Sequence, residues 1–198
     1  MEIEYYYSIA SPFAYLGSLR FQAIVKKYNL KVIEKPLDLV GKVFPETGGL
    51  PVPKRSIQRQ NYRLLEIERF GKSLNIKINS KPKFFPPKDP HLPAKFVIAA
   101  ILRGNILTVG HECLKALWCD EMDISDMATL KKISNKINLE IDFNKELQNE
   151  KINSIYVKNT TEAISKGVFG APTYIFNNEI FWGQDRLDSL EAKINKKI

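Results

Sequence analysis

Ser11 and Pro12 stand where a short apolar segment gives way to a helical pattern, which places a hydroxyl group at the start of a helix. Serine is a favoured N-cap residue, and proline is tolerated at the first helical position because its missing N–H would have no partner there. A hydroxyl at this point can donate a hydrogen bond to an external anion such as a thiolate, and the helix dipole stabilises the same negative charge. A plain helix cap explains an isolated Ser-Pro pair equally well, so its chemistry depends on its neighbours.

A second group of candidate residues lies near the C-terminus. Ala171 and Pro172 precede a strand-like segment, and proline is tolerated at the first position of a strand or at a sheet edge. Gln184 and Asp185 precede the last helix, for which Asp185 is the expected N-cap. Each pair has a purely structural explanation, so neither defines a function by itself.

Three arginines, Arg55, Arg59 and Arg63, follow one another at four-residue spacing, which predicts that they share one face of a helix. The chain contains 23 lysines and 7 arginines, so a cluster of arginines departs from its general usage. The guanidinium group is a fork-shaped donor that matches carboxylates, and the cluster therefore suggests carboxylate binding. The alternative is a solvated basic face that pairs partly with Glu66 and Glu68.

The elements that must position these residues follow an α/β pattern at both ends of the chain. Strand, helix and strand are expected at Glu2–Ser8, from Ser11-Pro12 to about Asn29, and at Lys31–Pro36, which is the signature of a βαβ unit with parallel strands. The end of the chain predicts a helix, a hairpin and a last helix. The ranges are Thr160–Lys166 closed by Gly167, the strands Thr173–Phe176 and Glu179–Trp182 around an Asn177-Asn178 turn, and a helix after Asp185 with Leu187, Leu190 and Ile194 on its apolar side.

The middle of the chain is predicted to be helical and loop-like, without strands. Gly41–Pro53 and the proline-rich segment Lys81–Pro93 are expected loops. The expected helices are Lys54 to about Leu74, Ala94–Arg103, Thr108–Asp120, Ser125–Ile137 and Asp142–Lys158. The order predicts an α/β protein with a thioredoxin-like fold split by an all-helical insertion. Residues 1–40 and 159–198 would form the discontinuous thioredoxin-like domain, and residues 41–158 the helical insertion domain.

Composition narrows the function classes further. The net charge of +8 comes from lysines scattered over most of the 198 residues, which is typical of a solvated surface, and we expect no nucleic-acid partner. No apolar run approaches the ~20 residues that span a bilayer, and the first seven residues lack the positive start of a secretory signal. We therefore expect a cytoplasmic protein that does not bind a membrane. Cys113 and Cys119 form no CxxC pair and no metal-ligand spacing, so we expect buried thiols and no metal.

Two separated motifs carry a family resemblance. The segments are Tyr7–Gly17 (YSIASPFAYLG) and Gly167–Tyr174 (GVFGAPTY), the latter followed by Phe181–Leu187 (FWGQDRL). Gly48–Pro51, Arg59–Tyr62 and Phe84–Pro86 also fit. Together they resemble 2-hydroxychromene-2-carboxylate isomerases and kappa-class glutathione transferases, which belong to the DsbA-like group of the thioredoxin superfamily. The resemblance runs from end to end of the chain.

The resemblance implies that glutathione is the cofactor and that several residues bind it. Ser11 would stand where thiol-disulfide oxidoreductases of this superfamily carry a reactive cysteine, and would stabilise the glutathione thiolate. Ala171-Pro172 would form a cis peptide bond that lets the backbone of Ala171 pair with the cysteinyl backbone of glutathione. Gln184 and Asp185 would hold the γ-glutamyl end.

One further contact departs from the family pattern. Arg59 stands where the kappa-class pattern has a lysine, three residues before Tyr62, which leaves a contact to glutathione plausible with a different geometry. The family's loop asparagine is missing near Gly48–Leu50.

The activity that the resemblance implies is isomerisation of a small aromatic carboxylate by reversible addition of the Ser11-stabilised thiolate, bond rotation and elimination, in a homodimer. The aromatic residues that could line a pocket for such a substrate, although core packing explains several of them, are Phe13, Tyr15, Phe84, Phe85 and Trp182.

Three alternatives stay open. A kappa-like glutathione transferase would release a thioether conjugate. A thiol-disulfide oxidoreductase or chaperone is disfavoured because Ser11 and Ala14 carry no sulfur. A non-catalytic binding module would show no turnover for Ser11→Ala to change.

Overall fold

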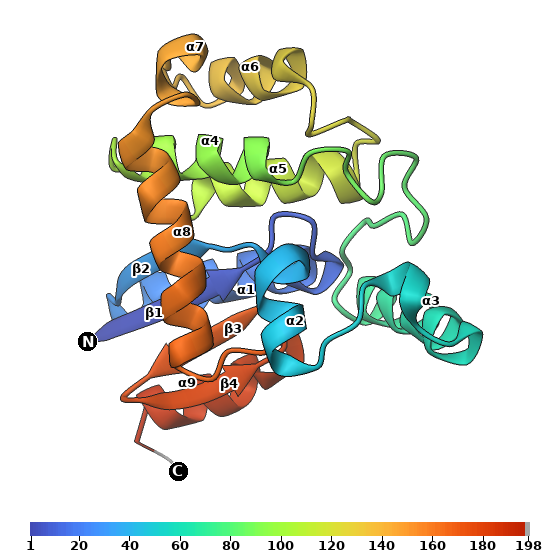
Figure 1. The fold of residues 1–198 in the computed structure, drawn as a ribbon. Helices are drawn as coiled ribbons and strands as arrows, with labels where there is room; N and C mark the ends of the chain where they lie inside the picture. The colour runs from blue at the N-terminus through green and yellow to red at the C-terminus, as the bar shows by residue number, and fades with distance from the viewer. Residues whose placement is uncertain (197–198) are drawn as a thin grey trace.

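The computed structural model describes residues 1–196 and has a four-stranded mixed sheet at its centre (Figure 1). Strands β1 (Glu2–Tyr7) and β2 (Lys31–Pro36) are parallel and are joined by helix α1 (Pro12–Tyr28), which confirms the predicted βαβ unit. Strands β3 (Thr173–Phe176) and β4 (Glu179–Trp182) are antiparallel, and β3 pairs antiparallel with β1. The strand order is β2-β1-β3-β4, so the two ends of the chain meet in the middle of the sheet.

The predicted hairpin turn is confirmed. Asn177 and Asn178 have φ values of +51° and +62°. Two successive residues with positive φ are typical of the type I′ turn, whose twist matches that of the flanking strands, and asparagine tolerates this region well.

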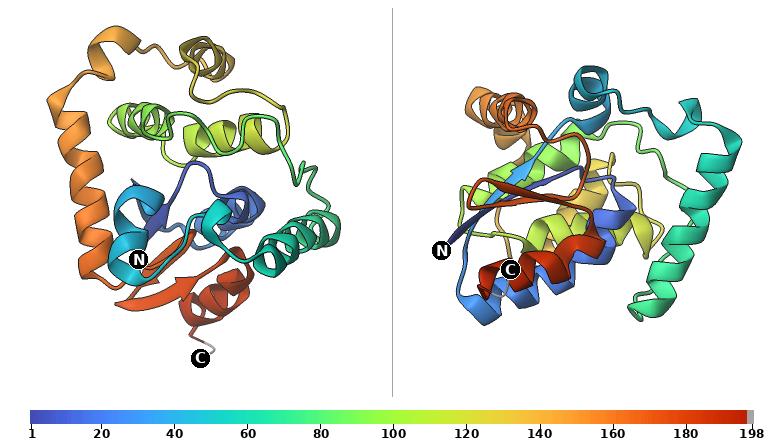
Figure 2. Two further views of the ribbon diagram at one scale, coloured as in Figure 1. Left: turned by 45° about the vertical axis from the view of Figure 1, so that its right-hand side comes forward. Right: turned by 90° about the horizontal axis from the view of Figure 1, so that it is seen from below.

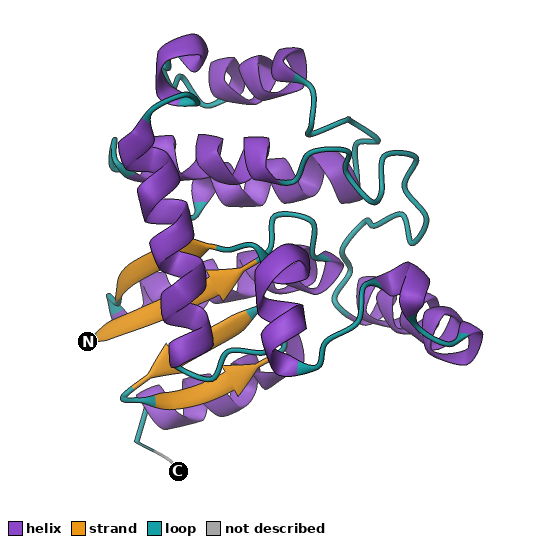
Figure 3. Ribbon diagram, in the orientation of Figure 1, coloured by secondary structure: helices purple, strands orange, loops and turns teal. Residues whose placement is uncertain are grey.

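Helices cover both faces of the sheet. Helix α1 packs against α9 (Leu187–Ile194) on one face, and α8 (Glu150–Ser165) crosses the other face (Figure 2). The strands lie together in this one sheet, and the segment between β2 and α8 is made of helices and loops (Figure 3). None of the helices in the described part of the chain has the length and apolar character needed to cross a membrane.

Consecutive tyrosines of β1 serve both faces of the sheet. Tyr5 stacks between Tyr7 and Tyr174, with ring centroids 4.5 and 5.2 Å apart, and Phe21 of α1 lies 4.9 Å from the Tyr5 ring. Tyr6 faces the opposite way, into a smaller apolar cluster beneath α8. Aromatic pairs of this kind contribute about 0.5–1.5 kcal/mol each beyond the area that they bury.

The middle of the chain forms the helical part, with α3 on one side of the molecule (Figure 1). The elements are α2 (Phe44–Thr47), α3 (Ile57–Ser73), α4 (His91–Ile101), α5 (Thr108–Trp118), α6 (Met127–Lys136) and α7 (Phe143–Glu146). Helix α4 begins three residues earlier than predicted, so Pro93 lies in its first turn, where proline is tolerated.

The prediction of a loop at Gly41–Pro53 is wrong. A single π-helical turn at Leu39–Val43 leads into α2, and a 3₁₀ turn follows at Val52–Lys54. The Asp38 side chain accepts a 2.8 Å hydrogen bond from the Gly41 N–H, and Val43 is fully buried. A local cap and one buried anchor therefore order a segment whose glycines and prolines resemble those of a loop.

The predicted break between Lys158 and Thr160 is also wrong, because α8 runs through both residues. Asn159 donates its side-chain N–H to the Pro36 carbonyl (3.2 Å), and the Thr160 hydroxyl accepts the Asp38 N–H (3.0 Å). These polar residues bind β2 and the following turn instead of ending the helix. The domain boundary predicted at 158/159 thus falls inside α8, and the division into domains stays a prediction.

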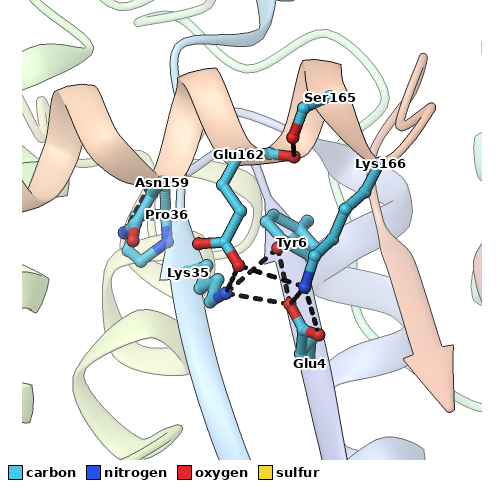
Figure 4. A network of polar contacts seen from close by, with 8 residues as sticks. All are labelled: Glu4, Tyr6, Lys35, Pro36, Asn159, Glu162, Ser165 and Lys166. Atoms are coloured by element: carbon cyan, nitrogen blue, oxygen red, sulfur yellow. Dashed lines mark hydrogen bonds and ion pairs between the residues drawn. The ribbon is translucent and has the colours of Figure 1, made fainter. Parts of the chain in front are cut away.

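A network of charged and polar side chains joins α8 to the sheet (Figure 4). Its members are Glu4, Tyr6, Lys35, Glu162 and Lys166. The ammonium group of Lys35, on β2, contacts Glu4 (2.8 Å), Glu162 (2.7 Å) and the Tyr6 hydroxyl (3.0 Å). Lys166 binds the same two carboxylates at 2.6 and 3.0 Å. Burial alone would raise the pKa of Glu4, but hydrogen bonds from Lys166, Lys35 and Tyr6 lower it to about 2. The network therefore ties the end of α8 to β1 and β2.

Candidate functional site

Ser11 is the N-cap of α1, as predicted. Its backbone is extended (φ −83°, ψ 121°), and its Oγ accepts the Ala14 N–H at 3.2 Å. Pro12 occupies the first helical position and Tyr15 donates its N–H to the Ser11 carbonyl. The hydroxyl thus lies at the positive end of a 17-residue helix, and the Ser11 residue is only 7% exposed.

The tertiary structure brings Ser11 to Ala171, 160 positions away in the chain. The Ser11 hydroxyl donates a 3.2 Å hydrogen bond to the Ala171 carbonyl. The Ala171-Pro172 peptide bond is cis, as the resemblance implied. The Ala171 N–H makes no hydrogen bond within the described residues, whereas the Pro172 carbonyl is occupied by the Gly183 N–H at 2.9 Å. One backbone donor of this loop is therefore available beside the Ser11 hydroxyl.

Gln184 lies next to the same helix. It begins a 3₁₀ turn at Gln184–Arg186 and is 1% exposed, and its side-chain NH₂ has no hydrogen-bond partner among residues 1–196. A Cβ on Gly17 of α1 would lie 2.8 Å from the Gln184 Cβ, so this close approach requires glycine. A buried amide donor without a partner costs free energy, which suggests that a ligand or solvent satisfies it.

Arg20 is a site residue that the sequence did not single out. Its Nη1 lies 3.4 Å from both the backbone oxygen and the side-chain oxygen of Gln184, and its Nη2 pairs with Asp188 at 2.7 Å. These contacts orient the Gln184 amide so that its NH₂ is left unpaired. The only signal in the sequence is an arginine in a chain that otherwise uses lysine.

Asp185 and Arg59 lie on the surface and are not hydrogen-bonded to Ser11, Ala171 or Gln184. The prediction of Asp185 as N-cap of the last helix is wrong, because α9 begins at Leu187 and its cap position makes no side-chain hydrogen bond. Asp185 instead folds over Gly183, whose φ of +108° turns the chain, and contacts Arg186 at 3.3 Å. Arg59 is exposed on the first turn of α3 and has no ion-pair partner among the described residues.

The aromatic candidates divide into core and surface residues. The Tyr15 hydroxyl donates to the Lys77 carbonyl at 3.1 Å, so Tyr15 has a packing role. Phe13 is half-buried and meets Phe70 of α3 edge-on, with centroids 6.5 Å apart. Trp182 is 50% exposed and overlies Gly170, directly before the Ala171-Pro172 pair. Phe13 is thus close to Ser11 in sequence. Trp182 lies in space against the residue before the Ala171-Pro172 pair.

The two cysteines do not form a redox pair. Cys113 is fully buried in α5, where burial raises its pKa, and Cys119 is half-buried; neither is in a disulfide. The described residues contain no cluster of three or more histidine, cysteine, aspartate or glutamate side chains that could hold a metal ion. The Ser11 hydroxyl and the Ala171 backbone are therefore the polar groups that the fold brings together, and Gln184 lies further along α1, beside Gly17 and Arg20.

Two proteins named 2-hydroxychromene-2-carboxylate isomerase are similar to this chain over almost its whole length. The chain is 23% identical to the 2-hydroxychromene-2-carboxylate isomerase of Sphingobium xenophagum over 191 residues, 96% of each protein. It is 24% identical to the enzyme of the same name from Pseudomonas putida over 208 residues, 99% of this chain and 95% of that one.

Solved structures share the fold at lower identity. A 2-hydroxychromene-2-carboxylate isomerase matches with a TM-score of 0.82 and 21% identity, covering 100% of this chain and 96% of that chain. The cytosolic disulfide reductase DsbM from Pseudomonas aeruginosa matches with a TM-score of 0.71 and 15% identity, or 0.66 and 16% in its structure with GSH; both cover 100% of this chain and 98% of that one. The model of the DSBA-like thioredoxin domain matches residues 2–195, and the chain therefore belongs to the DSBA-like thioredoxin domain family.

Proposed function

We propose that this chain is a glutathione-dependent isomerase that acts on 2-hydroxychromene-2-carboxylate or a closely related conjugated aromatic carboxylate. Relatives that carry this enzyme name match almost the whole chain. The observation that carries the proposal is the hydrogen bond from the Ser11 hydroxyl to the Ala171 carbonyl. It joins a serine at a helix N-terminus to the cis-proline loop, which is the pair of features that a thiol cofactor would need.

The residues present fit glutathione. The free Ala171 N–H offers one backbone hydrogen bond to an extended peptide, in the manner of an added strand. The unpaired Gln184 NH₂ offers a buried donor to a carboxylate or carbonyl oxygen. Asp185 is exposed nearby in sequence and would pair with an ammonium group, and Arg59 with a carboxylate. A DSBA-like neighbour has been solved with GSH, which supports the fit without identifying the contacts.

When bound, glutathione would supply a thiolate that adds reversibly to the conjugated double bond, permits rotation about the resulting single bond and is then eliminated unchanged. Ser11 would turn its O–H from Ala171 to the sulfur and stabilise the thiolate. A hydrogen bond to a charged group contributes about 1.5–3 kcal/mol, and the helix terminus about 0.3–1 kcal/mol. Because ~1.4 kcal/mol corresponds to one pKa unit, and because Ser11 gives up its bond to Ala171, we expect the thiol pKa to fall by about one to two units from ~8.5.

The test compares wild type with Ser11→Ala. Purified protein with glutathione should interconvert 2-hydroxychromene-2-carboxylate and its open-chain isomer, followed by ultraviolet absorbance. Ser11→Ala should lower kcat/KM about 10- to 100-fold and move the acid limb of the pH–rate profile upward by about one to two units. Ser11→Thr keeps both the hydroxyl and the cap, and should retain most of the activity.

Loss of the cap alone costs about 1 kcal/mol, so Ser11→Ala should remain folded, which a thermal melt would check. The proposal is wrong if wild type neither binds glutathione nor isomerises the chromene, or if Ser11→Ala leaves the rate and its pH profile unchanged. Mass spectrometry of the products provides the other check. A stable thioether as the end product would identify a glutathione transferase of the kappa type instead.

A further inference from the structure

Arg63 is a half-buried cation that has no counter-ion in the described part of the chain. Its guanidinium carbon lies 4.9 Å from the centroid of the Phe85 ring and 5.6 Å from that of Trp118. It forms no hydrogen bond or ion pair within the described residues. Burial, followed by repulsion from Arg55, lowers its pKa to about 10. Its N–H donors have no acceptor among the described residues and are therefore open to a ligand.

Arg55 is a second arginine close to an aromatic ring, and it lies outside α3. It lies directly before α3, not on it as predicted, and its Nε donates to the Leu50 carbonyl at 2.7 Å. Its guanidinium carbon is 5.9 Å from the Phe44 ring centroid. Burial and then the nearby Arg59 lower its pKa. The terminal nitrogens of Arg55 have no carboxylate partner among the described residues, so two aromatic-backed guanidinium groups repel each other with no anion between them.

The two glutamates of α3, Glu66 and Glu68, contact residues other than Arg55, Arg59 and Arg63. Glu66 pairs with Arg69 at 2.7 Å, and Glu68 accepts a 2.8 Å hydrogen bond from the Ser80 hydroxyl. The pairing that the alternative expected between this basic face and Glu66 and Glu68 is therefore wrong for the three arginines, although Arg59 is exposed as a solvated face would require. Partly burying cations without counter-ions costs free energy, and an anionic ligand would remove that cost.

Arg63 lies on α3, the helix that packs against the Ser11 helix. Phe70 of α3 contacts Phe13, two residues after Ser11, and Arg63 lies two turns, or about 10.5 Å, before Phe70 along α3. Figure 2 shows α3 at one side of the molecule, joined to the helices that follow by a long loop. Arg63 is therefore connected to the Ser11 helix through α3 and the contact between Phe70 and Phe13.

We infer that Arg63, assisted by Arg55, forms a subsite that binds the carboxylate of an aromatic carboxylate substrate, with the aromatic ring of the substrate against Phe85. The fork of in-plane N–H donors matches a carboxylate, and the ring wall favours an aryl group next to it. The identity of the substrate rests on the proposed function. The binding site itself requires neither glutathione nor turnover, which allows it to be tested separately.

The experiment measures binding of 2-naphthoate and of its neutral analogue 2-naphthamide by isothermal titration calorimetry, without glutathione. Wild type should bind the naphthoate at least tenfold more tightly. Arg63→Met should weaken naphthoate binding about 10- to 100-fold and leave the amide unchanged. Arg63→Lys keeps the charge without the fork and should restore part of the affinity. Arg69→Met is the matched control, because Arg69 lies on the same helix and pairs only with Glu66.

A thermal melt of each variant separates lost binding from lost folding, and Arg63→Lys supplies a second variant if Arg63→Met unfolds. The subsite is refuted if Arg63→Met or a folded Arg63→Lys binds the naphthoate like wild type. It is also refuted if Arg63→Met weakens glutathione binding and spares the naphthoate, because the arginine would then hold a carboxylate of glutathione. Ser11→Ala should bind the naphthoate normally. Naphthoate binding that depends on Arg63 in a protein without isomerase activity would support the subsite and count against the proposed function alone.

Discussion

Glu34 is a buried carboxylate whose ionisation should lower the stability of the protein as the pH rises. It lies on β2, accepts a 2.6 Å hydrogen bond from the Tyr7 hydroxyl and another of 2.6 Å from the Leu107 N–H, and forms no ion pair within the described residues. A cavity of about 10 Å³, enough for about one water molecule, adjoins it and is also lined by Tyr5 and His111. Burial raises the pKa of Glu34 from 4.5 to about 7, although the two hydrogen bonds lower it.

The sign and size of the effect follow from this shift. A raised pKa in the folded state means that the stabilising contribution is fully present below pH 4.5 and is lost as the pH rises through 7. The difference of about 2.5 units corresponds to about 3 kcal/mol. For a domain of this size, 1 kcal/mol shifts Tm by about 2–4 °C, so the expected loss is about 6–12 °C by pH 8.5.

The perturbation is Glu34→Gln, which keeps the shape of the side chain and removes the titration. One of the two donors, Tyr7 or Leu107, then meets the amide NH₂, so the variant should be less stable than wild type at pH 4.5 by about 1–3 kcal/mol. The difference should change by about 3 kcal/mol in favour of the variant between pH 4.5 and 8.5, so that Glu34→Gln is as stable as wild type or more stable at pH 8.5. Titrations that both proteins share, including that of Glu4 with its pKa of about 2, cancel in the difference.

Urea denaturation of both proteins across this pH range measures the difference in the free energy of unfolding. Glu140→Gln is a suitable control, because it makes the same substitution at an exposed position. A difference between wild type and Glu34→Gln that stays constant from pH 4.5 to 8.5 would show that Glu34 is not a buried titrating group, and the reasoning would fail.

Two further substitutions test the scaffold. Lys35→Met removes a cation shared by Glu4 and Glu162, and should lower the free energy of unfolding by about 2–4 kcal/mol in urea melts at pH 7; a variant as stable as wild type would show that the network is not stabilising. Gly170→Ala would place a Cβ into the Trp182 indole, displace the cis-proline loop and weaken glutathione binding in calorimetry about tenfold or more; wild-type affinity would show that the loop position does not matter for the cofactor.

Local sequence patterns were sufficient for the elements whose signals lie within a few residues. Ser11 caps a helix because its own side chain reaches the Ala14 N–H, and the Asn177-Asn178 turn follows from two residues that tolerate positive φ. The βαβ unit and the hairpin were predictable for the same reason. The family motifs then related the two ends of the chain to each other, including the cis bond before Pro172.

Contacts between distant residues decided the rest. Asn159 and Thr160 resemble the end of a helix in sequence, yet α8 continues because their side chains bind Pro36 and Asp38 more than 120 residues away. Arg63 resembles part of a solvated face until the structure shows where Phe85 lies.

In the candidate site, too, some features follow from local sequence and others from contacts between distant residues. The sequence by itself determined that a serine would cap the first helix and that the chain would form an α/β fold around it. Only the tertiary structure placed the Ala171 carbonyl on the Ser11 hydroxyl and left the Gln184 amide unpaired. The physical reason is that burial and hydrogen-bond satisfaction depend on the surroundings of a group, which spacing along the chain does not specify.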